Sequence, residues 1–215
     1  MDRMDQLTRY PQRGGDRRLL DEILDEGVVA VLSTVADGLP WSIPIAYARV
    51  GERIVLHGST GAGALRHVAA GAPATVTVTH LDALVVADTA FDHSMNYRSA
   101  VLRGVLEPVT VDGTELLDAF TDALLPGRSG ELRAHTRKEL AATTVLTLPI
   151  TEDNWIAKAR TGGASSSEGG WSGVLPLRKG YARIEPTPGQ DLPVPASVRA
   201  AVDGGRAEDR RAYAS

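Results

Sequence analysis

The feature of this sequence that most constrains its fold is a series of short β-type runs separated by turn signals. Residues 74–79 alternate apolar and polar side chains, as a strand does when one of its faces is buried. Asp37-Gly38 is a hairpin signal, and it stands between two further β-type runs at residues 28–35 and 41–50. Since most of these runs follow one another without a helix between them, the sequence predicts antiparallel rather than parallel strands.

Helical patterns occur at the ends of this series and at one or two points within it. Asp16 and Gly27 are the capping residues predicted for a helix over residues 17–26. The other predicted helices cover residues 60–70, 112–125 and 133–142. The other predicted strands cover residues 53–57, 84–87, 97–109, 143–150 and 155–160. The predicted fold class is therefore mainly β with peripheral helices, arranged as a closed antiparallel barrel.

The composition restricts the class of protein. With 215 residues, 43% of them apolar, the chain is long enough for one well-buried domain. Its 23 basic and 27 acidic side chains give a net charge of -4, which argues against binding to nucleic acid. The chain has no cysteine, so we expect neither disulfides nor thiolate metal sites. Residues 1–10 are too charged for a signal peptide and no run is long enough for a membrane span, so we expect a cytoplasmic protein without a membrane partner.

The sequence predicts one domain followed by a tail. We place the domain at residues 1–185, with a flexible loop at the Gly- and Ser-rich residues 162–170 and an ordered segment at residues 171–177. Residues 186–215 contain few large apolar side chains. We therefore expect that tail to be extended over a surface or partly disordered.

Two segments contain side chains of the kind that bind phosphate. The segment His57-Gly58-Ser59 closes an apolar strand and opens a helix on small residues. Residues 97–99 bring an aromatic ring, a guanidinium group and a hydroxyl together at the head of another strand. Backbone N–H groups at a helix start, hydroxyls and an arginine suit an anionic phosphate group. Together the two segments predict a pocket for a phosphorylated cofactor.

The order of these segments resembles that of the pyridoxamine 5′-phosphate oxidase-like FMN-binding split-barrel family, in the branch of the nitroimidazole-resistance proteins. The resemblance rests on residues 57–59, 94–99, 158–162 and 171–177, and it extends from about Arg13 to Tyr181. It implies a split β-barrel that forms a homodimer, with FMN bound in two equivalent clefts at the subunit interface. It also implies two-electron redox chemistry on the flavin.

The resemblance implies cofactor-binding roles for residues in the first part of the barrel. The backbone of Pro44 and Ile45 would lie along the isoalloxazine ring, and a proline within a strand is itself typical of an edge, a bulge or a backbone that faces a ligand. His57, Gly58 and Ser59 would meet the ribityl and phosphate portion of the flavin. From the residues alone, His57 could equally be a strand-end histidine that bonds its neighbours.

A second group of implied cofactor-binding residues comes from later strands. On the strand that approaches the phosphate they are Tyr97, Arg98 and Ser99, and in the segment that covers the cleft, often from the other subunit, they are Lys158, Arg160 and Trp171. The residues alone leave a second interpretation of Arg98 open, as a structural arginine paired with Asp88 or Asp92.

One position departs from the family pattern. Relatives commonly place Lys or Arg about six residues after the histidine, where it would pair with the phosphate, whereas this chain has Gly63 there. Arg66, one turn further on, is the nearby substitute. A missing charged hydrogen bond to phosphate costs roughly 1.5–3 kcal/mol, or about one to two decades in affinity. The departure leaves F420 open as an alternative cofactor.

We therefore predict a flavoprotein oxidoreductase that binds FMN at a homodimer interface and passes electrons from a reduced nicotinamide to a small organic acceptor. The flavin would carry the chemistry, so we assign no catalytic side chain. Two alternatives stay open: an F420-dependent oxidoreductase on the same fold, and a non-enzymatic sensor or binding module for a flavin or haem. The irregular spacing of His67, His80, His93 and His135 predicts no metal site.

Overall fold

The computed structural model of the chain describes residues 10–109, 113–164, 169–189 and 192–212. Its strands are β1 (Gly14–Gly15), β2 (Val29–Ala36), β3 (Leu39–Arg49), β4 (Arg53–Ser59), β5 (Pro73–Val86), β6 (Ser94–Val105), β7 (Glu107–Pro108), β8 (Thr143–Pro149), β9 (Trp155–Arg160) and β10 (Gly173–Pro176). Its helices are α1 (Arg17–Glu26), α2 (Gly63–Ala69), α3 (Gly113–Leu124), α4 (Arg137–Ala142) and α5 (Ala196–Ala212), with 3-10 turns η2 (Pro11–Arg13) and η3 (Ser129–Glu131).

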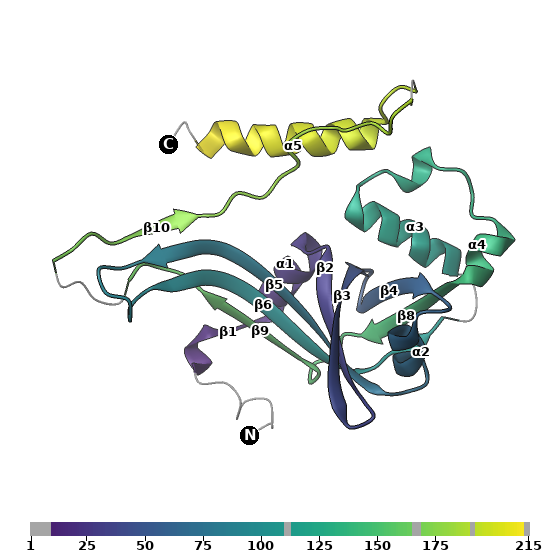
Figure 1. Cartoon of the computed structure of the whole chain (residues 1–215), viewed down its shortest axis with the longest axis horizontal. Helices are drawn as coiled ribbons and strands as arrows, with labels where there is room; N and C mark the ends of the chain where they lie inside the picture. The colour runs from purple at the N-terminus through teal and green to yellow at the C-terminus, as the bar shows by residue number, and fades with distance from the viewer. Residues whose placement is uncertain (1–9, 110–112, 165–168, 190–191, 213–215) are drawn as a thin grey trace.

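The strands form one antiparallel sheet that curls into an open barrel (Figure 1). Their order is β1-β9-β6-β5-β2-β3-β4-β8-β7, and β10 pairs with β5 off this path. Asp37 and Gly38 join β2 to β3 with φ angles of 52° and 77°, which confirms the predicted hairpin turn. The predicted class, an antiparallel and mainly β fold with peripheral helices, is also confirmed. The prediction of a closed barrel is wrong, because β1 and β7 at the two ends of the described strand order do not pair with each other.

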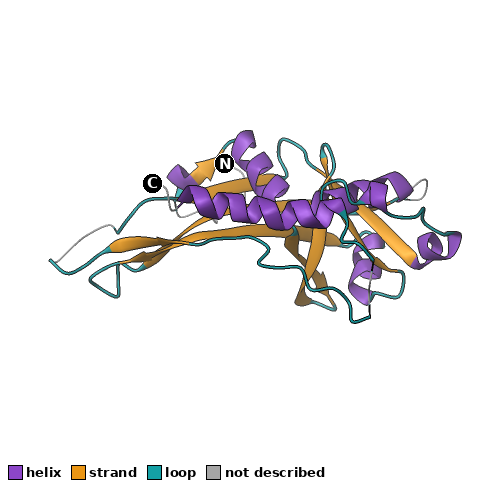
Figure 2. Cartoon of the chain, turned by 90° about the horizontal axis from the view of Figure 1, so that it is seen from above, coloured by secondary structure: helices purple, strands orange, loops and turns teal. Residues whose placement is uncertain are grey.

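The molecule is elongated because β5 and β6 continue past the barrel (Figures 1 and 2). β10 pairs with residues 83–86 of β5, along this projecting part. The sequence predicts a separate strand at residues 84–87, and the structure instead has one 14-residue strand. The register between β5 and β6 shifts between Leu81 and Ala83, and this β-bulge breaks the alternation that sequence analysis relies on.

The inner face of the sheet encloses the core, and α1 closes it. Leu20, Ile23 and Leu24 on one side of α1 are buried among the side chains of the inner face. Asp16 accepts a hydrogen bond from the backbone N–H of Leu19 at 3.0 Å, as predicted for the N-cap. These contacts place the end of α1 beside β3 and β5.

A buried tyrosine fixes the end of α1. The Tyr47 hydroxyl donates to the carbonyl of Leu24 at 2.9 Å, a carbonyl that has no partner within the helix. Gly27 follows the helix as predicted, but its φ is -82°, so the position does not need left-handed backbone. Glycine is required there because a Cβ would lie 2.2 Å from the Tyr47 hydroxyl oxygen.

A second, smaller core lies on the outer face, under α3. Leu117 and Phe120 of α3 pack with Ala48, Val55 and Val145 of the sheet. Helix α3 therefore covers the outer face at the β3, β4 and β8 end. The rest of the outer face is not covered by α3.

Two helices begin later than predicted. Helix α2 begins at Gly63, because residues 60–62 form a turn in which the N–H of Ala62 bonds the carbonyl of Ser59. Helix α4 begins at Arg137, where Thr136 and Glu139 form a capping box. Asp112, the cap predicted for α3, lies outside the described residues.

The tail forms a helix where the sequence predicts extended or disordered chain. Helix α5 begins at Ala196, and its N-terminus meets Glu131, whose carboxylate accepts hydrogen bonds from the Ser197 N–H and hydroxyl. This contact is made by a residue far away in the sequence, which is why the tail's composition does not reveal it. In the described part of the chain, we find no helix that combines the length and the apolarity needed to span a bilayer.

Candidate functional site

The outer face of β2 is lined with exposed valines. Side chains on a strand alternate between faces, and Ala30 and Leu32 point into the core. Val29, Val31 and Val35 point outward and keep 54%, 41% and 58% of their surface exposed. A row of exposed apolar side chains is typical of a surface that binds a ligand or another protein chain. The candidate site is built on this outer face.

Pro44 and Ile45 lie on opposite faces of β3. Pro44 pairs with Val31, so it shares the outer face, and it is exposed. Ile45 points inward and packs against the main core. The side chain of Pro44 therefore belongs to the candidate site, whereas Ile45 can contribute only its backbone.

His57 stands at the border between α3 and the exposed part of the outer face. Its ring is half-buried and meets the Phe120 ring edge-on, with 4.4 Å between the centroids. Burial lowers the pKa of His57, so the neutral imidazole is favoured at neutral pH. Neither ring nitrogen of His57 bonds another residue in the described part of the chain. A neutral imidazole with a free nitrogen lone pair is a metal ligand or a hydrogen-bond acceptor.

The residues after His57 divide between structural and exposed roles. A Cβ on Gly58 would lie 2.5 Å from a methyl group of Leu65, so Gly58 allows α2 to pack against the strand. Ser59 is exposed, and its hydroxyl accepts a hydrogen bond from the Gly61 N–H at 3.2 Å. Gly63 faces open space. Arg66 is exposed and pairs with no carboxylate among the described residues.

Four of the predicted residues share the outer face on β6 and β9. Ser99 pairs with Lys158 and Tyr97 pairs with Arg160, so the four side chains point the same way. Lys158, Ser99 and the Tyr97 hydroxyl bond no other described side chain. The Arg160 guanidinium donates to the Asn96 side-chain oxygen at 2.7 Å, and no carboxylate in the described residues neutralises it. This part of the face therefore carries hydroxyls and uncompensated positive charge.

Arg98 points to the opposite, inner face. Its guanidinium donates two hydrogen bonds of 2.8 Å to Glu26 and two of 3.0 and 3.2 Å to Asp82. These bonds raise the pKa of Arg98 and lower the pKa of Glu26. The two carboxylates occupy the guanidinium group and would repel a phosphate, so Arg98 is not placed to bind one. Arg98 is thus a structural arginine, although its partners are not the Asp88 or Asp92 that the sequence suggests.

Trp171 lies on the projecting part of the sheet. It precedes β10 and is 68% exposed. A Cβ on Gly173 would lie 2.8 Å from the indole ring, so the ring packs over that glycine. Trp171 is available to a partner chain or cofactor but lies apart from His57, because β10 pairs with the far end of β5.

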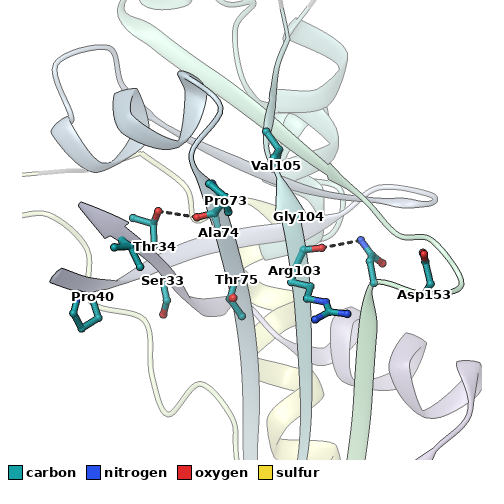
Figure 3. Close-up of a pocket in the computed structure, with 12 residues that line it drawn as sticks. Ser33, Thr34, Pro40, Pro73, Ala74, Thr75, Arg103, Gly104, Val105 and Asp153 are labelled. Atoms are coloured by element: carbon teal, nitrogen blue, oxygen red, sulfur yellow. Dashed lines mark hydrogen bonds between the residues drawn. The ribbon is translucent and has the colours of Figure 1, made fainter. Parts of the chain in front are cut away.

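A groove of about 710 Å³ continues the outer face beyond Val31 (Figure 3). Ser33, Thr75 and Arg103 line it together with apolar residues that include Val35 and Val105. None of the predicted site residues lines this groove. The signal that could have found it is the alternation of β2, β5 and β6, which places Ser33, Thr75 and Arg103 on one face.

The histidines do not gather into a metal centre. Among the described residues, no group of three or more His, Cys, Asp or Glu side chains is placed to hold a metal ion. His67, His80, His93 and His135 each bond a carbonyl or a carboxylate through a ring nitrogen. His57 differs from these four histidines because neither of its ring nitrogens bonds another described residue.

Comparison with known proteins adds a family match and several similar structures. Residues 16–156 match the family model of pyridoxamine 5′-phosphate oxidase. No curated protein matches the chain. A FAD and haem binding protein from Mycobacterium smegmatis is 44% identical, with a TM-score of 0.86 over 88% of this chain and 97% of that one. The flavocytochrome Anf3 from Azotobacter vinelandii is 31% identical, with a TM-score of 0.82 over 90% of this chain and 94% of that one.

A more distant structure shares the fold alone. It is a protein from Bacteroides thetaiotaomicron with a proposed role in resistance to 5-nitroimidazole antibiotics. Its identity to this chain is 16% and its TM-score is 0.56, over 67% of this chain and 84% of that one.

Proposed function

Because the chain belongs to the pyridoxamine 5′-phosphate oxidase-like flavin-binding family, as its sequence predicts, we propose that it is a flavin-dependent redox protein that also binds haem. The names of the two relatives that are 44% and 31% identical support haem as well as flavin, and the first favours FAD over FMN. A bound flavin and haem supply the chemistry that carries electrons from a reduced nicotinamide to a small acceptor. The residues of this chain bind and orient them.

His57 is the proposed haem ligand. The observation that carries this assignment is the neutral, half-buried imidazole whose nitrogens bond no other described residue. A ligating imidazole must be deprotonated at the nitrogen that binds iron, and the lowered pKa of His57 favours that state. The edge-on contact with Phe120 restricts rotation of the ring. The donor chemistry of His57 therefore fits haem iron.

The flavin phosphates have suitable partners on the outer face. Ser59, Ser99 and Tyr97 offer hydroxyls, and Lys158 offers an ammonium group that no described carboxylate neutralises. Phosphate oxygens bind such groups through charge-assisted hydrogen bonds. Arg98 is excluded from this set because Glu26 and Asp82 occupy its guanidinium.

These residues meet around one flavin only if two copies of the chain associate. The strand order places β4, with Ser59, five strand spacings from β9, with Lys158. At roughly 4.8 Å per spacing the two strands lie about 24 Å apart along the sheet. The exposed valines of β2 lie between them and offer an apolar surface to a second copy. In the homodimer that we propose, one subunit supplies Ser59 and the other supplies Lys158.

Titration of the purified protein with cofactors tests the proposal. FAD, FMN, F420 and haem are added separately, and binding is followed by absorbance and flavin fluorescence. Saturable uptake of FAD and haem is the expected result. Uptake of FMN without haem would favour the simpler flavoprotein, uptake of F420 alone would favour the deazaflavin alternative, and uptake of none would overturn the proposal.

The role of His57 is tested separately with two variants. His57→Ala should weaken haem binding at least about tenfold, since a ligand to the iron is lost. His93→Ala, which changes an exposed histidine bonded to the carbonyl of Thr89, is the matched control and should bind haem normally. An unchanged Soret spectrum and affinity in His57→Ala would remove His57 as the ligand.

Lys158→Met tests the flavin site. Loss of a charged hydrogen bond should weaken flavin binding by about one to two decades. Lys138→Met on the exposed surface of α4 is the control, and its flavin affinity should match that of the unaltered protein. Equal affinities for the two variants would exclude Lys158 from the site.

A further inference from the structure

The segment of residues 177–189, which we call the C-terminal strap, leads from β10 toward α5 (Figure 1). The strap leaves the sheet where the Leu177 N–H bonds the carbonyl of Asp82 at 2.8 Å. Two residues later, the Lys179 ammonium lies 3.0 Å from Nδ1 of His80. His80 is a residue of the inner face and is only 6% exposed. The strap is thus attached to a buried histidine.

The contacts of His80 determine its protonation state. Nε2 of His80 lies 2.9 Å from the carbonyl oxygen of Ile23, and a carbonyl only accepts hydrogen bonds, so Nε2 carries the hydrogen. An ammonium group only donates, so Nδ1 must present its lone pair to Lys179. The pair of contacts is satisfied only by the neutral imidazole. A second proton on His80 would place an N–H opposite the Lys179 ammonium.

While His80 is neutral, the formal charges of the four ionised side chains around it cancel. Helix α1 contributes Glu26, β5 contributes Asp82, β6 contributes Arg98 and the strap contributes Lys179. Glu26 and Asp82 are already engaged by Arg98, each through two hydrogen bonds. From β3, the Tyr47 hydroxyl also reaches the end of α1, and burial raises its pKa, so it stays neutral. An added charge on His80 would attract the Glu26 carboxylate and repel the Lys179 ammonium, which bonds no other residue in the described part of the chain.

A second anchor holds α5 independently of His80. Glu131 accepts hydrogen bonds from the N–H and the hydroxyl of Ser197 at 3.1 and 2.6 Å. These bonds lower the pKa of Glu131 to about 2, so its carboxylate stays ionised in mildly acidic solution. Acidification from pH 8 to pH 5 would consequently affect the strap without affecting the N-terminus of α5.

We propose that His80 and Lys179 form a proton-sensitive latch, which holds the C-terminal strap on the inner-face cluster when His80 is neutral and releases it when His80 is protonated. Histidine is the side chain whose charge ordinarily changes between about pH 5 and pH 8, so the test of the latch covers that range. Release frees the strap between two fixed points, the end of β10 and the start of α5.

The absence of cysteine from the sequence allows a single spin label to report on the latch. Ala182→Cys places a nitroxide on the strap, and Ala200→Cys places one on an exposed position of α5. Electron paramagnetic resonance line shapes are recorded from pH 8 to pH 5 on the full chain. The label at residue 182 should change from mostly immobile to mostly mobile as the pH falls, and the label at residue 200 should not change.

Three further variants in the Ala182→Cys background separate the latch from other effects of pH. Lys179→Met should make the label mobile at pH 8 as well as at pH 5. His80→Gln, which can donate to Ile23 and accept from Lys179 but does not titrate, should keep the label immobile throughout. His93→Gln, a change at an exposed histidine, should reproduce the original pH response. The same line shape at pH 8 and pH 5 in the parent, or an immobile label in Lys179→Met, would overturn the proposal.

Discussion

On the inner face of the sheet, His80 bonds through both ring nitrogens and Arg98 makes four hydrogen bonds to two carboxylates. On the outer face, the polar groups of His57 and Lys158 bond no other described residue. Buried polar groups must be paired because an unpaired one costs free energy, whereas groups awaiting a ligand are left open. The difference separates residues that hold the fold together from residues that can bind something else, even where they are neighbours in sequence.

The largest effect that this comparison predicts is at Gly27, which follows α1 and lies against the Tyr47 hydroxyl. Gly27→Ala would push a methyl group onto the Tyr47 hydroxyl and break its bond to Leu24. We expect a loss of about 2–4 kcal/mol in the free energy of unfolding, from overpacking together with the lost hydrogen bond. Urea denaturation of the variant and of the unaltered protein measures this loss in the free energy of unfolding. Gly130→Ala, where a Cβ would meet no atom, is the control, and a loss as small as the control's would contradict the prediction.

Arg98→Met should lower the free energy of unfolding by about 1–2 kcal/mol, since Glu26 and Asp82 lose a partly buried partner. Flavin and haem affinities should stay within about twofold of those of the unaltered protein. Arg18→Met removes an exposed ion pair with Glu22 and should change stability by less than about 0.5 kcal/mol. A tenfold loss of flavin affinity in Arg98→Met would show that Arg98 contributes to the cofactor site. The inner face would then not be purely structural.

The sequence reveals elements whose signals are local. The Asp16 cap, the Asp37-Gly38 turn and the alternation of residues 74–79 depend on neighbours in the chain, and each is confirmed. The bulge after Leu81 and the start of α5 are not visible, because they depend on pairing between distant strands and on Glu131.

The candidate site could be predicted only in part, for a related reason. The sequence motif predicts that Tyr97, Arg98 and Ser99 act as one group. Successive side chains on a strand point to opposite faces, however, so Arg98 faces away from the other two. The same rule separates Pro44 from Ile45. Period-two alternation could have made both separations from the sequence, whereas the carboxylates that hold Arg98 come from α1 and the β5 bulge and need the folded structure.

A smaller effect should appear in the pH dependence of stability. The pKa of Glu26 is lowered below its usual 4.5 by hydrogen bonds from Arg98. A lowered carboxyl pKa means that the ion pair stabilises the fold above about pH 4.5 and that this stabilisation is lost as the pH falls through the lowered value. Because Glu26 is half-exposed, solvent screening limits the contribution to less than about 1 kcal/mol.

The matched comparison is between the unaltered protein and Glu26→Gln at each pH. Their free energies of unfolding should differ at pH 7 and converge as the pH falls below 4.5 and Glu26 becomes increasingly protonated. Urea midpoints at several pH values from pH 7 to below pH 4.5 measure the convergence. A difference that stays constant across the range would mean that the Glu26 carboxylate does not contribute through its charge.

The smallest change in the stability of a single chain is expected on the outer face. Val31→Lys alters a side chain that is 41% exposed and belongs to neither core cluster, so the monomer should lose less than about 0.5 kcal/mol. The same change places a charge in the middle of the surface that we propose a second copy covers. Sedimentation velocity should therefore show a dimer for the unaltered protein and a monomer for Val31→Lys, with weaker flavin binding because Ser59 and Lys158 no longer meet. Leu132→Lys, at a 48% exposed leucine outside the sheet, should remain dimeric. If Val31→Lys unfolds the monomer more readily than Arg98→Met does, the outer face stabilises its own chain and is not a surface left open for a partner.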